Sequence, residues 1–195
     1  MKYLLLAVIL TSVLVQCKQK DNNTKAINST IDSTAEKPAY FPLTSYIKGE
    51  LLEIKNSGIN PLKYTTLNNK KDSAWVKIEE MENVFAEYIQ PEIDSSTLAP
   101  YFTEKKFFDQ TLNAITLTYD PVKQLPDSFQ LQHFDVYIEP EKNKVEKIYM
   151  VKKLANGKIR QLTWHSGKSA RAITVSEDSS GKPVIEDELL IKWNF

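Results

Sequence analysis

Three side chains have the types and spacing that could do chemistry: the carboxylate of Asp135 and the two histidines, His133 and His165. His133 and Asp135 stand two residues apart in an alternating segment, so on a β-strand they would point to the same side. His165 falls two strands further along a predicted meander, where imidazole and carboxylate groups could bind a metal or activate a nucleophile. Between them lie Lys147 and Tyr149, which are poor metal ligands. A solvent-facing polar sheet face is therefore the stronger interpretation, and no metal is expected.

Two short segments match only part of a known catalytic or phosphate-binding motif. The Gly-Lys-Ser tail of a phosphate-binding loop occurs at 167–169, but Leu162 stands where that loop needs its first glycine, and a predicted strand follows instead of a helix. Ser45 and Lys48 have Ser-x-x-Lys spacing at the start of an ordinary amphipathic helix, and no Gly-x-Ser-x-Gly is present. We expect no catalytic residues and no cofactor.

The supply of aromatic side chains is high for one domain, with nine Tyr, eight Phe and three Trp. Most must serve the core. Tyr137 and Tyr149 fall on the polar side of predicted strands, and Phe107 falls in a predicted loop. Exposed aromatic side chains are typical of contact surfaces. A possible partner surface therefore comprises Tyr137, Tyr149, His133, Asp135, His165 and Phe107.

Composition limits the class of protein. The chain has 195 residues, with 25 basic and 25 acidic side chains and a formal net charge of zero. Nucleic-acid-binding domains usually carry a basic stripe, so no nucleic-acid partner is expected. An apolar share of 42% excludes a wholly disordered protein. The single cysteine, Cys17, excludes an intrachain disulfide framework and a multi-cysteine zinc site.

Residues 1–16 have the pattern of a secretory signal peptide. Lys2 supplies the early positive charge, and Leu4 to Val15 form an uncharged, mostly apolar run. A membrane-spanning helix needs about 20 apolar residues, so this run is too short to span. Residues 18–38 are rich in Asn, Ser, Thr, Lys and Asp. They cannot bury enough apolar area to offset their ordering entropy, which predicts a tether with a reach of about 25 Å.

The segment Leu14-Val15-Gln16-Cys17 resembles the bacterial lipobox, with Gln16 in place of the usual small residue. Residues 1–21 and the overall layout resemble small lipoproteins of Bacteroidota that have no defined activity. The resemblance implies that Cys17 is acylated, with palmitate-type chains, and holds the protein on the outer membrane, at its periplasmic or its surface-exposed face. Each buried methylene contributes about 0.8 kcal/mol, so several chains anchor almost irreversibly.

Residues 39–195 are expected to form one α+β domain: an antiparallel β-meander of about six strands curled against two helices. Apolar residues at helical spacing predict one helix over 45–56, capped by Thr44, and a second over 78–90. Between them, residues 62–67 and 73–77 read as extended. After the second helix, residues 91–100 read as irregular and residues 101–108 as a loop. From Leu112 the period becomes two, which predicts strands over 112–119, 129–139, 145–154, 158–165, 170–177 and 184–195.

Alternation along these strands assigns two faces. The apolar set, expected to pack against the helices, is Ile115, Leu117, Phe134, Val136, Ile138, Ile148, Met150, Leu154, Leu162, Trp164, Ile173, Val175, Leu189, Ile191, Trp193 and Phe195. The polar set, expected to face solvent, is His133, Asp135, Tyr137, Lys147, Tyr149, Lys153, Gln161, Thr163, His165, Thr174, Glu186, Glu188 and Lys192.

Three functions remain open. The leading hypothesis is a lipid-anchored cell-envelope protein whose non-catalytic domain binds or assembles with a protein or glycan partner. The second is a carrier or chaperone for an apolar ligand such as a lipid, which would need an apolar cavity of several hundred Å³ between sheet and helices. The third is a hydrolase, which would need perturbed titratable groups, His133 or His165 among them, in a cleft.

Overall fold

The structure, a computed structural model, describes residues 40–194. The predicted signal peptide, the lipid site at Cys17, the tether and the last residue of the final predicted strand lie outside the described residues. The domain is α+β, as expected, and is built on one antiparallel sheet.

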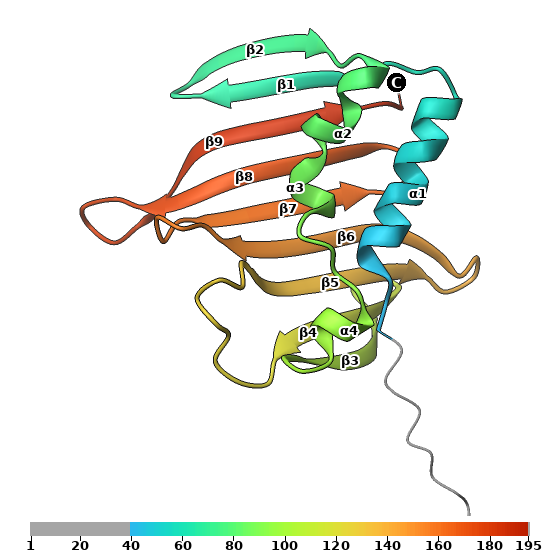
Figure 1. Cartoon of the computed structure of the whole chain (residues 1–195), viewed down its shortest axis with the longest axis vertical. Helices are drawn as coiled ribbons and strands as arrows, with labels where there is room; N and C mark the ends of the chain where they lie inside the picture. Colours follow the sequence, from blue (N-terminus) through green and yellow to red (C-terminus); the bar gives the residue numbers. More distant parts are fainter. Residues whose placement is uncertain (1–39, 195) are drawn as a thin grey trace, which may run out of the picture. The chain divides into compact units, whose positions relative to one another are not determined.

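The sheet has nine strands in the order β2-β1-β9-β8-β7-β6-β5-β4-β3. Strands β3 to β9 form a continuous meander, and the β1–β2 hairpin adds to its last strand (Figure 1). The strands are β1 (Leu62–Leu67), β2 (Lys70–Trp75), β3 (Phe102–Asp109), β4 (Ala114–Pro121), β5 (Leu131–Glu139), β6 (Lys144–Lys153), β7 (Ile159–His165), β8 (Ser169–Glu177) and β9 (Pro183–Lys192).

All the helices of the described chain lie on one face of this sheet (Figure 1). They are α1 (Leu43–Asn56), the 3-10 turn η1 (Ile78–Glu80), α2 (Met81–Val84), α3 (Ala86–Ile89) and α4 (Ser95–Leu98). The long helix α1 packs beside α3 and buries Ile47, Leu51 and Ile54, the apolar stripe that its sequence spacing predicts. No helix of residues 40–194 lies on the other face of the sheet.

The expected number of six strands is wrong. The two extended segments near the start pair as the hairpin β1–β2, closed by Asn68 and Asn69, whose positive φ angles of 49° and 64° suit a tight type I′ turn. The segment 101–108, expected to be a loop, falls on the edge strand β3. An edge strand is hydrogen-bonded on one side only, so β3 tolerates consecutive lysines and exposed aromatic residues that obscure its alternation.

The helix predictions also need correction. The helix expected over 78–90 is split into η1, α2 and α3, and Phe85 at the break points its fully buried ring into the core. Helix α1 starts at Leu43, so Thr44 lies inside the helix instead of capping it. The Thr44 hydroxyl oxygen accepts a hydrogen bond from the backbone of Ile93 at 2.8 Å, which ties the α3–α4 connection to α1.

The two faces of the sheet follow the expected alternation on most strands. Phe134, Ile148 and Leu162 are fully buried under the helices. Strand β8 is the exception, because Ile173 and Val175 face away from the helices and Thr174, expected outside, is buried beneath them. The small residues Ala170 and Ala172 share the helix side of β8 with Thr174, and they leave room there for the large side chains of β7.

An aromatic cluster fills the space between sheet and helices. The ring of Phe85 lies 5.5 Å from that of Trp164 and 5.9 Å from that of Trp193, and Tyr88 lies 5.6 Å from Trp164. Edge-to-face arrangements at these distances are the favoured geometry for aromatic rings. The cluster joins the α2–α3 break to β7 and to the residue after β9, so it holds the helix layer on the sheet.

Charged side chains of the sheet also bind the helix layer. Arg160 of β7 binds Glu87 of α3 with two hydrogen bonds of 2.8 and 3.0 Å, and also reaches Asp187 of β9. Buried Lys152 of β6 donates to the backbone oxygens of Glu87 and Gln90, the latter at 2.8 Å. It thereby satisfies carbonyls at the end of α3 that have no helical partner.

Loss of the Phe85 ring should lower the stability of the domain more than a change on the outside of the helices. We expect Phe85→Ala to lower the free energy of unfolding by about 3–5 kcal/mol, because it leaves a cavity beneath Trp164. The matched control is Leu52→Ala on α1, where the side chain is 58% exposed and the loss should stay within about 0.5 kcal/mol. Denaturant unfolding of both variants measures this, and equal losses would contradict the placement of the core.

Lys152 should make stability depend on alkaline pH. Burial lowers the pKa of Lys152 from 10.5 to about 8. Between these two values the unfolded chain binds more protons than the folded chain, so the contribution of Lys152 to stability rises with pH. The difference in unfolding free energy between wild type and Lys152→Met should therefore shift in favour of wild type from pH 8 to 10.5. A difference that stays constant over this range would show that Lys152 is not buried as described.

Candidate functional site

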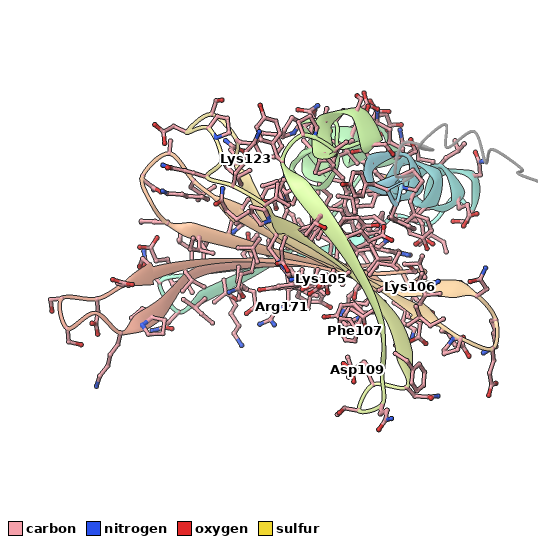
Figure 2. The ribbon with its side chains drawn as sticks, turned by 90° about the horizontal axis from the view of Figure 1, so that it is seen from below. Lys105, Lys106, Phe107, Asp109, Lys123 and Arg171 are labelled. Carbon is pink, nitrogen blue, oxygen red and sulfur yellow. The ribbon has the colours of Figure 1, made fainter. Side chains whose placement is uncertain are left out.

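The candidate site lies on the face of the sheet that carries no helix, here called the open face. Figure 2 views the sheet nearly edge-on, with the helices on one side and Phe107, Asp109 and Arg171 on the other. The side chains that point to the open face come from alternate positions of all nine strands. Most of them are half-buried, because neighbouring side chains on a pleated sheet cover one another.

A hydrogen-bonded imidazole lies at the centre of the site. His133 Nδ1 lies 2.9 Å from a carboxylate oxygen of Asp120, and His133 Nε2 lies 3.0 Å from a carboxylate oxygen of Asp135. A carboxylate only accepts hydrogen bonds, so both ring nitrogens donate and the ring is held as an imidazolium. Strand β4 supplies Asp120, and β5 supplies the other two residues, so this clamp ties the two strands together.

Four further side chains surround this clamp. Lys105 of β3 donates to Asp120 at 3.0 Å, and Thr118 donates to Asp135 at 2.6 Å. The hydroxyl of Tyr137 reaches Asp135 at 3.3 Å. The ring of Tyr149 on β6 meets the His133 ring edge-on at 6.4 Å. Each charge in the cluster therefore has an opposite charge or a donor beside it. The list of residues, called the His133 cluster below, is Lys105, Thr118, Asp120, His133, Asp135, Tyr137 and Tyr149.

The pKa values within the cluster follow from these contacts. Burial opposes the charged form of His133, but hydrogen bonds from its ring to Asp135 and Asp120 raise the pKa of His133 above its ordinary value. Burial would likewise raise the pKa of Asp120, yet hydrogen bonds from Lys105 and His133 hold it below the usual range. Burial and the nearby Asp135 carboxylate raise the pKa of Tyr137 to about 12. These contacts therefore favour the imidazolium form of His133 and the ionised form of Asp120, and they favour the neutral phenol of Tyr137.

This arrangement orders its charges and leaves His133 without a free basic nitrogen. To act as a general base, an imidazole needs a nitrogen lone pair, and both nitrogens of His133 are already bound to carboxylates. The hydroxyl of Thr118 donates to Asp135, so it is not oriented toward the imidazole. Within residues 40–194 no group of three or more His, Cys, Asp or Glu side chains has the geometry to hold a metal ion.

The structure brings together four of the residues that the sequence selects: His133, Asp135, Tyr137 and Tyr149. His165 lies outside the His133 cluster, beside Lys147 and Lys168, and burial followed by these two positive charges lowers its pKa. Phe107 lies on strand β3 instead of in a loop, and its side chain is 49% exposed. Both residues share the open face with the cluster.

Sequence reasoning missed Asp120, Lys105 and Thr118. Asp120 and Thr118 lie near the end of β4, and only the paired register shows that they meet β5 at His133 and Asp135. Lys105 lies on the unpredicted strand β3. The alternation of Thr116, Thr118 and Asp120 is the signal that places this polar side of β4 next to β5.

Comparisons of the chain with protein-family models, with curated proteins and with solved structures found no match. Within the described part of the chain, none of the helices has the length and apolar character needed to cross a bilayer.

The two histidines should contribute to stability with opposite pH trends. The folded pKa of His133 is raised, so its contribution is full below the unfolded value of about 6.5 and is lost as pH rises through the folded value. The advantage of wild type over His133→Gln should therefore be larger at about pH 5.5 than at about pH 9. The folded pKa of His165 is lowered, so the advantage of wild type over His165→Gln should be larger at the higher pH.

Denaturant unfolding at the two pH values measures both differences. The same trend in both variants would contradict the assignment of a clamped imidazolium at position 133 and a neutral imidazole at position 165.

Proposed function

We propose that the chain is a lipid-anchored protein of the cell envelope, and that its domain is a non-catalytic binding module whose open face contacts the partner. Acylated Cys17 would hold it on the outer membrane, and residues 18–38 would let the domain reach a partner at the periplasmic or surface-exposed side. One observation carries the proposal: a sheet of nine strands has its helices on one side and a half-buried, aromatic-rich and charge-ordered surface on the other.

Two properties of the open face support a contact role. Its charges are pre-ordered, as in the ion pair of Arg171 with Glu188 at 2.7 Å and the clamp on His133, so little side-chain entropy remains to be lost on binding. Tyr64, Trp75 and Phe107 expose 39%, 61% and 49% of their surface there. Aromatic side chains of this kind contribute much of the binding energy in protein interfaces.

Native mass spectrometry of the full chain, extracted gently from its own membrane, tests the proposal. Wild type should carry acyl mass on Cys17 and a partner at fixed stoichiometry. The double variant Tyr149→Ala/Arg171→Ala, which changes the centre of the open face, should lose most of that partner. The matched control Leu52→Ala, on the exposed side of α1, should keep it.

Each alternative outcome of this experiment is informative. A partner that survives the double variant, or that is lost in Leu52→Ala, would contradict the open face as the contact surface. Wild type without any partner would contradict the binding module. A bare chain without acyl mass would overturn the lipid anchor.

A second candidate, a carrier for an apolar ligand, is favoured by one groove. It lies on the helix side of the sheet, beyond the end of the helix layer, and has a volume of about 570 Å³. Leu67, Val84 and Leu189 line it. It is open to solvent, whereas the space under the helices is filled by the fully buried rings of Phe85 and Trp164. A small apolar mass bound to wild type and lost in Leu67→Asp would favour this function.

A further inference from the structure

One row of cross-strand neighbours crosses the whole open face without an acidic side chain. The printed sequence does not show it, because its members come from nine different strands and meet only through the paired register. The row, called the cationic row below, is Trp75, Leu62, Lys192, Ser169, His165, Lys147, Tyr137, Thr116 and Phe107, in the order in which the strands lie.

The positive charges of this row are concentrated at its centre. These charges belong to Lys147 on β6 and Lys192 on β9, and to Lys168 in the β7–β8 turn; the imidazole of His165 on β7 lies between them. Three strand spacings separate Lys147 from Lys192, which is about 14 Å between the backbones. None of the three lysines forms an ion pair with another residue of the range 40–194. This distinguishes them from Lys105 and Arg171 in the neighbouring row, which bind Asp120 and Glu188.

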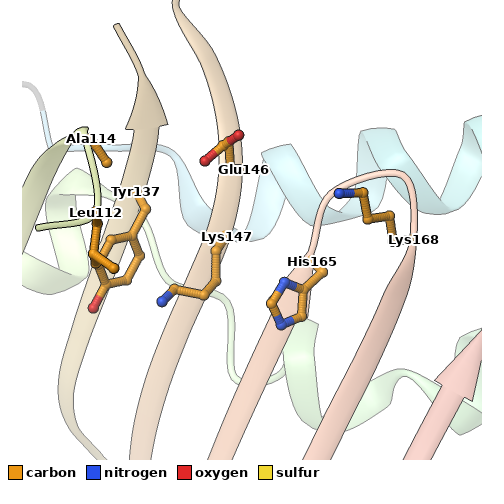
Figure 3. Close-up of a pocket in the computed structure, with 7 residues that line it drawn as sticks. All are labelled: Leu112, Ala114, Tyr137, Glu146, Lys147, His165 and Lys168. Atoms are coloured by element: carbon orange, nitrogen blue, oxygen red, sulfur yellow. The ribbon is translucent and has the colours of Figure 1, made fainter.

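A small pocket opens at the centre of the row. Its volume is about 190 Å³, and its lining includes Tyr137, Lys147, His165 and Lys168, with Leu112 and Ala114 as an apolar wall. Figure 3 shows Tyr137, Lys147 and His165 side by side on three neighbouring strands. The Lys147 ammonium lies 3.7 Å from the centre of the Tyr137 ring. Glu146 is the one acidic residue of the lining, and its side chain is exposed.

We propose that the cationic row binds a linear acidic glycan, with a carboxylate of the sugar chain in the pocket between Lys147 and Lys168. This inference rests on the proposed function, because it names the class of partner that the open face takes. An anion here would supply the opposite charge that the row lacks. A chain of linked sugars, unlike a single one, can span the distance from Lys147 to Lys192 and contact the rings toward Phe107.

The chemistry of the row favours a sugar chain over an acidic polypeptide. A polypeptide laid across a sheet face brings many backbone N–H groups that need acceptors, and the only side-chain oxygen acceptors of the row are a few hydroxyls, such as those of Ser169 and Tyr137. A pyranose ring presents apolar C–H faces that pack on flat rings, such as those of Tyr137 and Phe107, and its hydroxyls can remain in water. Ser169 and the ammonium groups can bind the hydroxyls that face the sheet.

Binding of the acidic glycan should also change the pKa of His165. In the free protein the pKa of His165 is lowered by burial and by the charges of Lys147 and Lys168. The other charged and titratable groups around it are Lys192 across β8, Glu146 at the rim and Tyr137 beyond Lys147. A carboxylate placed between the two lysines offsets their charge. An NMR titration of the His165 ring should therefore give a higher pKa with the glycan than without it.

Calorimetric titration of the full chain in detergent tests the proposal with three probes: an oligogalacturonate, an uncharged cello-oligosaccharide of similar length, and an oligoglutamate peptide. The oligogalacturonate should bind, the cello-oligosaccharide should not, and the peptide should bind more weakly. The double variant Lys147→Gln/Lys192→Gln should weaken oligogalacturonate binding about tenfold, as expected for the loss of two exposed ion pairs. The matched control is Lys153→Gln, on the same strand and the same face but outside the row.

Several results would overturn the inference. They are equal binding of the uncharged sugar, tighter binding of the peptide, equal losses in Lys153→Gln and the double variant, or no binding of oligogalacturonate. If oligogalacturonate does not bind while the native partner is still lost in Tyr149→Ala/Arg171→Ala, the open face remains the contact surface and only the acidic glycan is excluded.

Discussion

The structure depends on the packing of one short helical layer against one side of a wide sheet. The rings of Phe85, Trp164 and Trp193 interlock where the α2–α3 break meets the sheet, and α1 closes over them. The buried apolar side chains form one core between the sheet and the helices. No helix of residues 40–194 covers the second face of the sheet, which is the open face.

An uncovered sheet face must be stable in water, and the polar contacts on it serve that need. His133 joins β4 to β5 through two carboxylates, and Lys105 extends the contact to the edge strand β3. The clamp thus keeps the outer strands in register where no helix packs on that side. The same contacts leave a surface with its charges fixed in place. The same hydrogen bonds therefore stabilise the outer strands and pre-order the charges of the surface for binding.

The class of fold and the central strands were predictable, because burial on one face imposes a period of two that shows in residues such as Phe134 and Ile148. The strand β3 and the break at Phe85 were not. An edge strand needs little burial, so Lys105 and Lys106 carry no alternation, and a break in a helix is decided by the ring that it must bury. Only part of the site was predictable. His133 and Asp135 lie on one strand, so their spacing shows that they share a face, whereas Asp120 meets them only through the pairing of β4 with β5.

Hydroxyl-radical footprinting tests the central claim most directly, by comparing the chain in its native membrane with the purified chain in detergent. Contact through the open face predicts that Tyr137, Tyr149 and Phe107 are less oxidised in the membrane, while Leu52 on the outside of the helix layer reacts equally in both. Protection of Leu52 together with unchanged reactivity of the three aromatic residues would contradict it, and would move the contact surface to the helix side.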